Sequence, residues 1–238
     1  MLTRREFLLR SLALGSASVL PAIAGGCAGE APVEGLWVND IHSKLNRTRV
    51  ADIVRPESTE ALSALVRDAR RTGSALSIAG GRHAMGGQQF GTGTTLVDTT
   101  AMTQVLDFDR DQGLVEVEAG IQWPALHAYL REAQTGGGSA WGFNQKQTGA
   151  DRLSLGGALS ANVHGRGLRL KPIVQDIESF VLIDAEGRAL RCSRDENAEQ
   201  FRLAIGGYGN FGFIASVHLR LVPGIQLRRV VQIALIYS

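Results

Sequence analysis

The spacing of apolar residues predicts an amphipathic helix early in the folded part of the chain. In residues 56–73, apolar side chains recur at the i, i+3, i+4 and i+7 positions that share one helix face. Ser58 stands where a helix N-cap is expected, and Gly73 follows the apolar positions and ends the helix. The apolar positions are Leu62, Leu65, Val66 and Ala69.

Short apolar stretches on either side of a glycine-rich loop predict two strands. Residues 75–80 lead into the loop and residues 94–100 leave it, so a βαβ unit is expected around residues 78–90. Residues 113–120 alternate apolar and charged side chains, as a half-buried strand does. Pro124 suits the first turn of a helix that follows.

The end of the chain also has strand patterns. Residues 180–193 predict two strands about a polar turn at residues 185–188, and residues 211–224 predict a last strand. No internal repeat, low-complexity linker or domain break interrupts the pattern between Trp37 and Pro223. The chain is therefore predicted to form an α+β domain with mixed sheets flanked by helices. The apolar positions of the last strand are Ile214, Val217, Leu219 and Leu221.

The N-terminal residues have the pattern of a targeting signal. Arg4 and Arg5 precede a moderately apolar stretch and several small residues, which is typical of a twin-arginine signal peptide at residues 1–27. The uninterrupted apolar part has about 14 residues, fewer than the ~20 that span a bilayer. An amphipathic N-terminal helix is the alternative interpretation.

The signal predicts export to the periplasm or cell envelope. Cleavage is expected after Ala24, or the protein is anchored by lipidation of Cys27, although the lipoprotein pattern lacks its usual Leu at Ala24. The twin-arginine route carries proteins that are already folded, often around a cofactor. The signal therefore also indicates a cofactor.

Composition and charge exclude several kinds of partner. The net charge is +2, with no basic stripe interleaved with aromatic residues, so no nucleic acid is expected. Of the 2 cysteines, Cys27 lies in the predicted signal, which leaves Cys192 without a disulfide partner. No pair of histidines has ligand spacing with a carboxylate or cysteine, so no metal is expected.

The 29 glycines are clustered, and two clusters lie in the loop "AGGRHAMGGQQF". Backbone N–H groups in a glycine-rich turn can face one concavity and hold a pyrophosphate without a lysine. The loop matches neither Gly-x-Gly-x-x-Gly nor the phosphate loop that ends in Gly-Lys-Ser/Thr. The spacing alone therefore leaves phosphate binding open. The loop glycines are Gly80, Gly81, Gly86 and Gly87.

A second glycine-rich segment, residues 145–167, combines polar side chains with bare backbone and could hydrogen-bond a flat heterocycle. The alternative is a helix of small residues packed closely on a sheet, which does not explain Asn162 and His164. A serine-based triad is disfavoured, because neither His83 nor His164 accompanies a Gly-x-Ser-x-Gly turn. The small-residue helix would explain Gly156, Gly157, Ala158 and Ala161.

Several motifs, taken in order, resemble the FAD-binding domain of the vanillyl-alcohol-oxidase type. These PCMH-type, FAD-linked flavoproteins include aldonolactone and alditol oxidases. The motifs include "AGGRHAMGGQQF", "LSLGGALSANVHGRG" and "GGYGNFGFIASVHLRLVP", and the resemblance covers residues 37–223. It implies a two-subdomain fold in which residues 79–85 hold the FAD pyrophosphate, residues 154–165 run beside the flavin and backbone near Ile214 reaches the adenine. The implied cofactor-binding residues are Ala79, Gly80, Gly81, Arg82, His83, Ala84, Met85, Gln147, Ser154, Gly157, Ser160, Ala161, Asn162, His164 and Ile214.

The resemblance gives His83 a particular role. In many family members the histidine at this place is bonded covalently to the 8α carbon of the flavin. This chain has Ala84 next to it, where a serine is common. Some members with a different residue at the place of His83 hold FAD noncovalently. The resemblance thus implies FAD as the cofactor, with covalent attachment through His83 or noncovalent binding as the alternative.

Family members usually continue into a substrate domain that covers the flavin and supplies the acid or base acting on substrate. Residues 224–238 are expected to be the start of such a domain, which is otherwise absent from this chain. The sequence therefore assigns no catalytic residue.

Three functions are compatible with these observations. The first is an exported FAD-dependent oxidoreductase acting on a CH–OH group of a small molecule, in which this chain supplies the FAD-binding half. The second is an FAD-binding module without turnover of its own, which needs a complementing chain that carries a substrate domain. The third is a carbohydrate- or lipid-binding envelope protein without flavin.

Overall fold

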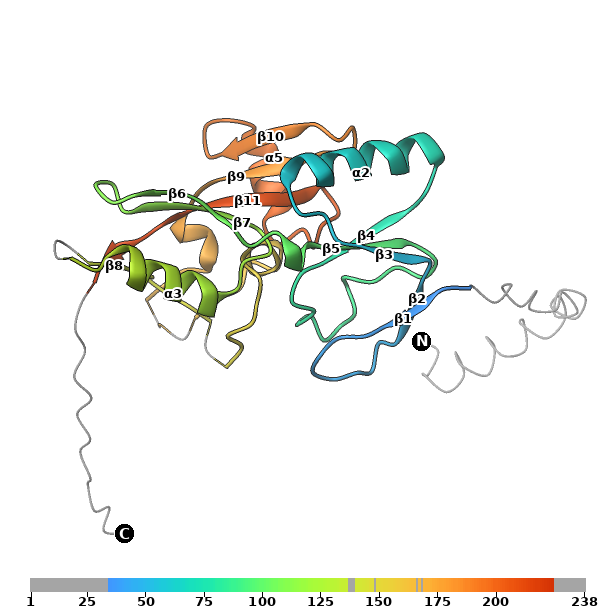
Figure 1. Ribbon diagram of the computed structural model, residues 1–238, viewed down its shortest axis with the longest axis horizontal. Coiled ribbons are helices and arrows are strands. Elements are labelled where there is room, and N and C mark those ends of the chain that lie inside the picture. The colour runs from blue at the N-terminus through green and yellow to red at the C-terminus, as the bar shows by residue number, and fades with distance from the viewer. Residues whose placement is uncertain (1–33, 137–139, 148, 166, 168, 225–238) are drawn as a thin grey trace, which may run out of the picture. The chain divides into compact units, whose positions relative to one another are not determined.

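The computed structural model describes residues 34–136, 140–147, 149–165, 167 and 169–224 (Figure 1). The predicted signal peptide, with Arg4, Arg5 and Cys27, lies outside these residues, as do residues 225–238 of the predicted start of a substrate domain at 224–238. No helix in the described ranges combines the length and the apolar character that crossing a membrane requires.

The predicted amphipathic helix is confirmed as α2, Thr59–Thr72. The Ser58 side chain accepts a hydrogen bond from the Ala61 N–H at 3.1 Å, which satisfies a donor that the first turn leaves unpaired. Gly73 ends the helix in the left-handed conformation, with φ 70°. The buried face of α2 includes Leu62, Val66 and Ala69.

The helix α2 connects two strands of a parallel sheet. The sheet has the order β3-β5-β4, and the glycine-rich loop joins the end of β4 to the start of β5. In parallel strands the carboxyl ends lie at the same edge, so the loop begins beside the end of β5. Ala79 accordingly pairs with Asp98 in the register. The strands are β3 (Asp52–Val54), β4 (Leu76–Ala79) and β5 (Thr95–Asp98), and a separate antiparallel pair is formed by β1 (Leu36–Val38) and β2 (Thr48–Val50).

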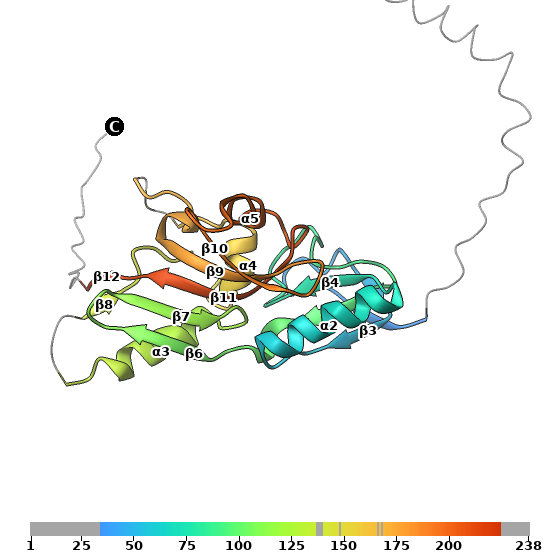
Figure 2. The same cartoon turned by 90° about the horizontal axis from the view of Figure 1, so that it is seen from above.

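A larger antiparallel sheet forms the second part of the fold (Figure 2). Its order is β10-β9-β11-β7-β6, so the last long strand lies in the middle, between β9 and β7. The predicted hairpin about residues 185–188 is confirmed. The strands are β6 (Val105–Asp109), β7 (Leu114–Glu118), β9 (Ile177–Ile183), β10 (Ala189–Ser193) and β11 (Phe213–Arg220), with a small pair β8 (Trp141–Gly142) and β12 (Val222–Pro223).

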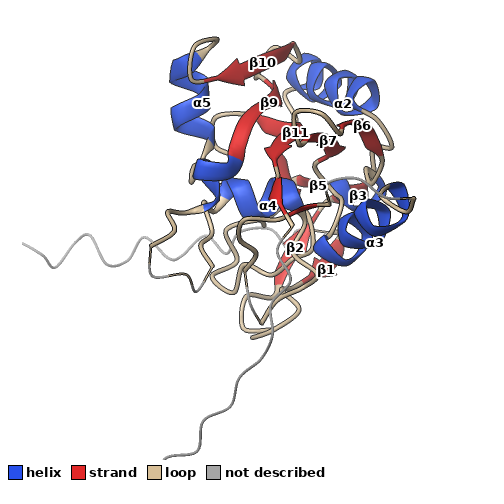
Figure 3. Ribbon diagram, turned by 90° about the vertical axis from the view of Figure 1, so that its left-hand side faces the viewer, coloured by secondary structure: helices blue, strands red, loops and turns tan. Residues whose placement is uncertain are grey.

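The predicted α+β class is therefore confirmed. The sequence predicted mixed sheets, but each sheet in the described residues is either parallel or antiparallel. The parallel sheet and the larger antiparallel sheet belong to different parts of the fold. Helices lie around the strands (Figure 3). Pro124 stands in the first turn of α3, as predicted. The remaining helices are α3 (Trp123–Ala133), α4 (Leu155–Ser160) and α5 (Ala198–Ala204), with 3₁₀ turns η1 (Thr99–Ala101) and η2 (Ile173–Asp176).

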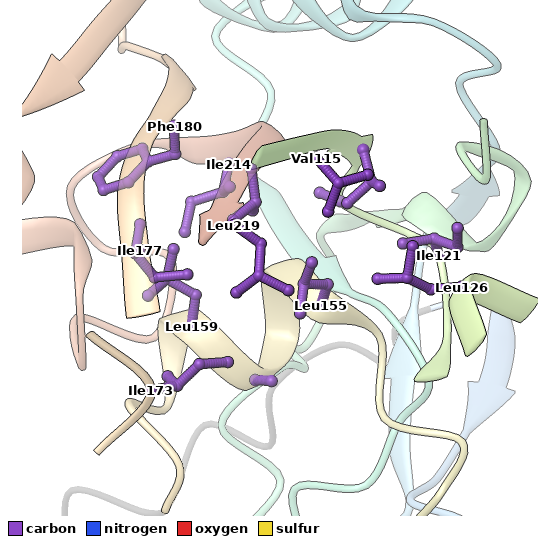
Figure 4. Packing of buried hydrophobic residues seen from close by; sticks show 14 of the residues in the cluster. Val115, Ile121, Leu126, Leu155, Leu159, Ile173, Ile177, Phe180, Ile214 and Leu219 are labelled. Carbon is purple, nitrogen blue, oxygen red and sulfur yellow. The ribbon is translucent and has the colours of Figure 1, made fainter. Parts of the chain in front are cut away.

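The short helix α4 is fixed by the main hydrophobic core. Leu155 and Leu159 are almost completely buried and point toward side chains of β9 and β11, among them Ile177 and Leu219 (Figure 4). A Cβ at Gly156 would lie 2.6 Å from the Cβ of Ala119, so only glycine allows this approach. The small-residue packing considered from the sequence is therefore present, and it holds one face of α4 against the antiparallel sheet.

Candidate functional site

A cavity of ≈ 220 Å³ lies where the two parts of the fold meet. Its walls come from the end of β4 and the loop after it, from α4 and the residues before it, and from the segment that leads into β11. The first two walls are the two glycine-rich segments that the sequence singled out. The fold therefore brings together segments that lie more than 50 residues apart in the chain.

Most of the predicted site residues line this cavity. Met85, Asn162 and His164 do not. Met85 is 60% exposed, and the His164 ring faces its own backbone, with Nδ1 2.9 Å from the Gly165 carbonyl. Asn162 takes φ 45°, and its Oδ1 accepts from the Val174 N–H at 3.4 Å. The predicted residues on the wall are Ala79, Gly80, Gly81, Arg82, His83, Ala84, Gln147, Ser154, Gly157, Ser160, Ala161 and Ile214.

On the third wall of the cavity, the sequence predicted only Ile214. Tyr208, with φ 52°, and the glycines around it lie before β11 and also line the cavity, where Gly209 approaches Ile78 of β4. The glycine cluster "GGYGNFG" was the available signal. The lining residues outside the prediction are Ile78, Gln88, Gln89, Thr99, Ala119, Leu153, Gly156, Val163, Tyr208, Gly209, Gly212 and Phe213.

Two glycines of the loop touch the segment before α4. A Cβ at Gly80 would lie 1.9 Å from Ser154 Oγ and 2.8 Å from Ser154 Cβ. A Cβ at Gly81 would lie 2.4 Å from the carbonyl oxygen of Arg152. Both distances are far below van der Waals contact, so only glycine fits at these two positions. The cause is packing of the loop against the segment before α4, and no ligand is involved.

The buried carboxylate of Asp98 fixes the next residue of the loop. Its Oδ2 accepts from Arg82 at 3.1 Å and from Arg55 at 3.2 Å, while Oδ1 accepts from the Thr100 N–H and hydroxyl. Burial alone would raise the pKa of Asp98, but the Thr100 hydrogen bonds and then the two guanidinium groups hold it below its ordinary value. Arg82, at φ 56°, thus has its charge paired with Asp98. An anion on the loop would be held mainly by backbone N–H groups.

Several buried polar atoms on the cavity wall have no hydrogen-bond partner. They are His83 Nε2, Gln89 Oε1, Gln147 Oε1 and Ser154 Oγ. In the described part of the chain, Trp123 Nε1 is the other buried side-chain atom without a partner. Leaving such a group unpaired costs about 1–3 kcal/mol. Their concentration around one cavity indicates a ligand that offers both donors and acceptors.

His83 also makes a contact that the sequence did not predict. Its Nδ1 lies 2.7 Å from Nε2 of His42, which precedes it by 41 residues. Burial, and then the neighbouring His42, lower the pKa of His83, whereas the Arg152 carbonyl acts in the opposite direction. The His83 ring is therefore uncharged at neutral pH. No sequence motif marked His42.

A family model described as "FAD binding domain" matches residues 50–193. The chain belongs to this family of FAD-linked flavoproteins. The family and the FAD cofactor expected from the sequence motifs are thereby confirmed. The glycine contacts and the unpartnered polar atoms fit such a ligand, because FAD carries phosphate acceptors together with N–H and hydroxyl donors.

The chain is similar to enzymes of known function. It is 30% identical over 177 residues to L-gulono-1,4-lactone dehydrogenase of Mycobacterium tuberculosis (strain ATCC 25618 / H37Rv), covering 74% of this chain and 39% of the relative. It is 29% identical over 172 residues to cytokinin dehydrogenase 2 of Arabidopsis thaliana, with 71% and 33% covered. It is 27% identical over 175 residues to L-gulonolactone oxidase of Bos taurus, with 73% and 38% covered. The match thus spans well under half of each relative.

A solved structure supports the fold. An alkyldihydroxyacetonephosphate synthase structure superposes with TM-score 0.63 at 20% identity, covering 72% of this chain and 31% of that chain. At this identity the likeness concerns the fold alone.

Gly80→Ala tests whether the contact between the loop and Ser154 shapes the FAD site. Rotation of the serine hydroxyl cannot relieve the clash with Ser154 Cβ, so the loop must move. We expect FAD affinity to fall by about tenfold or more, the equivalent of about 1.4 kcal/mol, measured from flavin absorbance during titration. Gly142→Ala is the matched control, because a Cβ there meets nothing within 4 Å. Unchanged affinity in Gly80→Ala would contradict this role.

Proposed function

We propose that the protein is the FAD-binding part of an oxidoreductase that oxidises a CH–OH group of an aldonolactone or a similar small molecule. The observation that supports it most is the set of unpartnered polar atoms around a cavity built from the family's two glycine-rich segments. The substrate class is taken from the relatives named as gulonolactone dehydrogenase and oxidase. A small-molecule substrate also agrees with the weak net charge.

The chain's own residues would hold the cofactor in a defined orientation. Backbone N–H groups of the loop from Gly80 to Ala84 would hold the pyrophosphate, since the Arg82 charge is already paired. Gln89 and Gln147 each present an unpartnered carbonyl oxygen and would accept from N–H or hydroxyl groups. When bound, FAD supplies the hydride chemistry. The protein's contribution is binding, orientation and the exclusion of water from one face.

We propose that FAD is attached covalently to His83, with noncovalent binding as the alternative. The ring is uncharged, lines the cavity and has a buried nitrogen, Nε2, with no partner in the described residues. An uncharged imidazole has a lone pair available for bond formation, which an imidazolium does not. Attachment would keep the cofactor in place after export.

Reduction of the bound flavin tests the proposed function. Purified protein is expected to show flavin absorbance, and an aldonolactone added without oxygen is expected to bleach it. Bound flavin that no lactone or alditol reduces would instead support a binding module completed by another chain. Protein without flavin would overturn both and favour an envelope protein that binds carbohydrate or lipid.

Acid precipitation tests the attachment to His83. Flavin is expected to stay with the precipitated wild-type protein and to appear in the supernatant for His83→Ala. The variant removes the imidazole but leaves the backbone N–H groups of the loop, so total flavin content before acid is expected to change little. Release of flavin from the wild-type protein would end the covalent assignment without contradicting noncovalent FAD binding.

We further propose export by the twin-arginine route, supported by Arg4 and Arg5 before an apolar stretch. Changing both residues to lysine keeps the positive charge and leaves the apolar stretch unchanged. A failure of export in this variant would therefore not result from lost charge or lost hydrophobicity of the signal. The double variant is expected to accumulate as precursor in the cytoplasm, measured by cell fractionation. Normal export of that variant would contradict the route.

Labelling with a radioactive fatty acid distinguishes lipidation at Cys27 from cleavage after Ala24.

A further inference from the structure

The antiparallel pair β1–β2 turns one face to the fold and the other to solvent. Val38 and Val50 are buried in a hydrophobic cluster with residues of the parallel sheet. Side chains alternate between the two faces of a strand, so Trp37 and Arg49, which pair directly across the two strands, point away from that cluster. Figure 1 shows this pair of strands on the side of the parallel sheet away from α2. Trp37 is 53% exposed, so a large aromatic side chain lies on an outer surface.

Two arginines lie against the Trp37 ring. The guanidinium carbon of Arg47 lies 4.1 Å from the ring centroid, and that of Arg49 lies 5.6 Å from it. Arg49 Nε also donates to the Gly35 carbonyl at 3.3 Å. Among the residues that the structure describes, neither arginine forms an ion pair with a carboxylate. A guanidinium stacked on an aromatic ring keeps its full charge, so both charges are available to an anion.

The loop between β1 and β2 is held by hydrogen bonds and projects a leucine. The Asp40 carboxylate accepts from the backbone N–H groups of His42 at 2.9 Å and Ser43 at 2.6 Å, and from the Ser43 hydroxyl at 2.8 Å. Asp40 is the one acidic residue in the sequence from 36 to 50, and it is buried. Leu45 follows the exposed Lys44 and is itself 86% exposed. The loop thus leaves an apolar side chain in water, where it gains nothing from core packing.

The exposed apolar side chains of this hairpin lie among basic ones. We call Trp37, Ile41, Lys44, Leu45, Arg47 and Arg49 the hairpin patch. A tryptophan ring is apolar with one polar N–H, and such rings are enriched at the interface between bilayer and water. Lysine and arginine side chains can lay their apolar stems along that interface and place their charges on anionic headgroups. The composition of the hairpin patch therefore fits the surface of an anionic bilayer.

The hairpin patch is attached to the glycine-rich wall of the cavity. The Ile41 N–H donates to the Arg82 carbonyl at 3.1 Å, and the Asn46 side-chain amide donates to the Met85 carbonyl. Both acceptors belong to the loop between β4 and β5. A surface that binds the hairpin patch would therefore lie beside this loop.

Two observations favour a bilayer over an acidic protein as the occupant. Leu45 projects from a loop, and a fluid bilayer adapts to a projecting side chain, whereas a protein needs a matching pocket. Cys27, the alternative lipidation site, lies ten residues before Trp37. Ten residues of chain span at most about 36 Å. A lipid on Cys27 and the hairpin patch can therefore reach the same bilayer.

We propose that the hairpin patch docks the protein on the surface of an anionic bilayer. Its three apolar side chains lie among the headgroups, and its three basic side chains lie on the phosphates. The contact is peripheral, and its strength depends on the apolar area that leaves water together with the attraction between charges. The docking goes beyond the proposed oxidoreductase and requires neither FAD nor a lipid on Cys27.

Vesicle binding by the chain that begins at Gly25 tests the docking, since this chain lacks the signal and receives no lipid when made in the cytoplasm. Residues 34–238 form one compact unit, so the shortened chain keeps the hairpin patch. We expect it to sediment with vesicles of phosphatidylglycerol and phosphatidylcholine in equal amounts, and not with vesicles of phosphatidylcholine alone. Added salt is expected to release it, because salt screens the charges. Brominated lipid is expected to quench tryptophan fluorescence, and Trp37→Phe to remove most of that quenching.

Single substitutions test the hairpin patch itself. We expect the affinity for the anionic vesicles to fall about tenfold in Trp37→Ala, about fivefold in Arg47→Gln and about threefold in Leu45→Ser. The Leu45 side chain makes so little contact that its variant is expected to keep the wild-type circular dichroism spectrum. Arg202→Gln and Leu203→Ser are the matched controls, because both residues are exposed on α5, and they are expected to change the affinity little. Equal losses in the α5 variants would overturn the proposal.

Other occupants of the hairpin patch give different results. A second copy of the chain predicts a dimer in analytical ultracentrifugation that Leu45→Ser dissociates. An acidic protein predicts binding to polyglutamate in place of vesicles. Either result, or no binding to the anionic vesicles, would overturn docking on a bilayer. The vesicle assay does not use flavin, so its outcome is distinguishable from failure of the proposed oxidoreductase function.

Discussion

The site depends on the close approach of the loop backbone at Gly80 and Gly81 to the segment before α4. Gly80 and Gly81 follow β4 of the parallel sheet, and Arg152 and Ser154 lead into α4 on the antiparallel sheet. The two segments meet so closely that a Cβ at either glycine would overlap the other segment. Any side chain here would push the two parts of the fold apart. The cavity between them exists because these two positions have no side chain.

The helix α4 gives that contact a rigid base. Leu155 and Leu159 are buried in the core (Figure 4). Gly156 packs against Ala119, the residue after β7. The other face of the same helix presents Gly157 and Ser160 to the cavity. Close packing is therefore confirmed for this segment, while its role as a cofactor wall stays a prediction that its place on the cavity supports. Gly156 packs on Ala119 and also lines the cavity, so periodicity over so few residues could not separate the two interpretations.

The elements that the sequence predicted best are those with local causes. The helix α2 has its cap at Ser58 and its end at Gly73, and both signals lie within the helix's own neighbourhood. The position of β11 between β9 and β7 depends on packing between distant segments, for which no local pattern exists. His42 was missed for the same reason, because its distance to His83 is set by hydrogen bonds that cross 41 residues.

Two residues predicted to bind the cofactor lie off the cavity wall and show a further limit. Met85 and His164 lie in the two glycine-rich segments, yet their side chains turn away, Met85 to solvent and His164 to its own backbone. A motif fixes the path of the backbone, whereas the direction of each side chain follows from local φ and ψ values and neighbours. Prediction from a motif is therefore most reliable for the path of the backbone, as at Gly80 and Gly81, which line the cavity.

The ion pairs of Asp98 fix the shape of the loop that we propose as the anion-binding segment. Asp98 is buried and pairs with both Arg82 and Arg55, so the arginine inside the loop serves to hold the loop's shape. An anion placed there would meet N–H dipoles whose directions are already set, and little would have to reorganise on binding. The same preorganisation leaves the polar atoms of His83, Gln89 and Ser154 buried without partners until a ligand arrives. The free energy lost by those unpaired groups is recovered on binding, so the ligand with the right pattern of donors and acceptors is favoured over one that only fits the space.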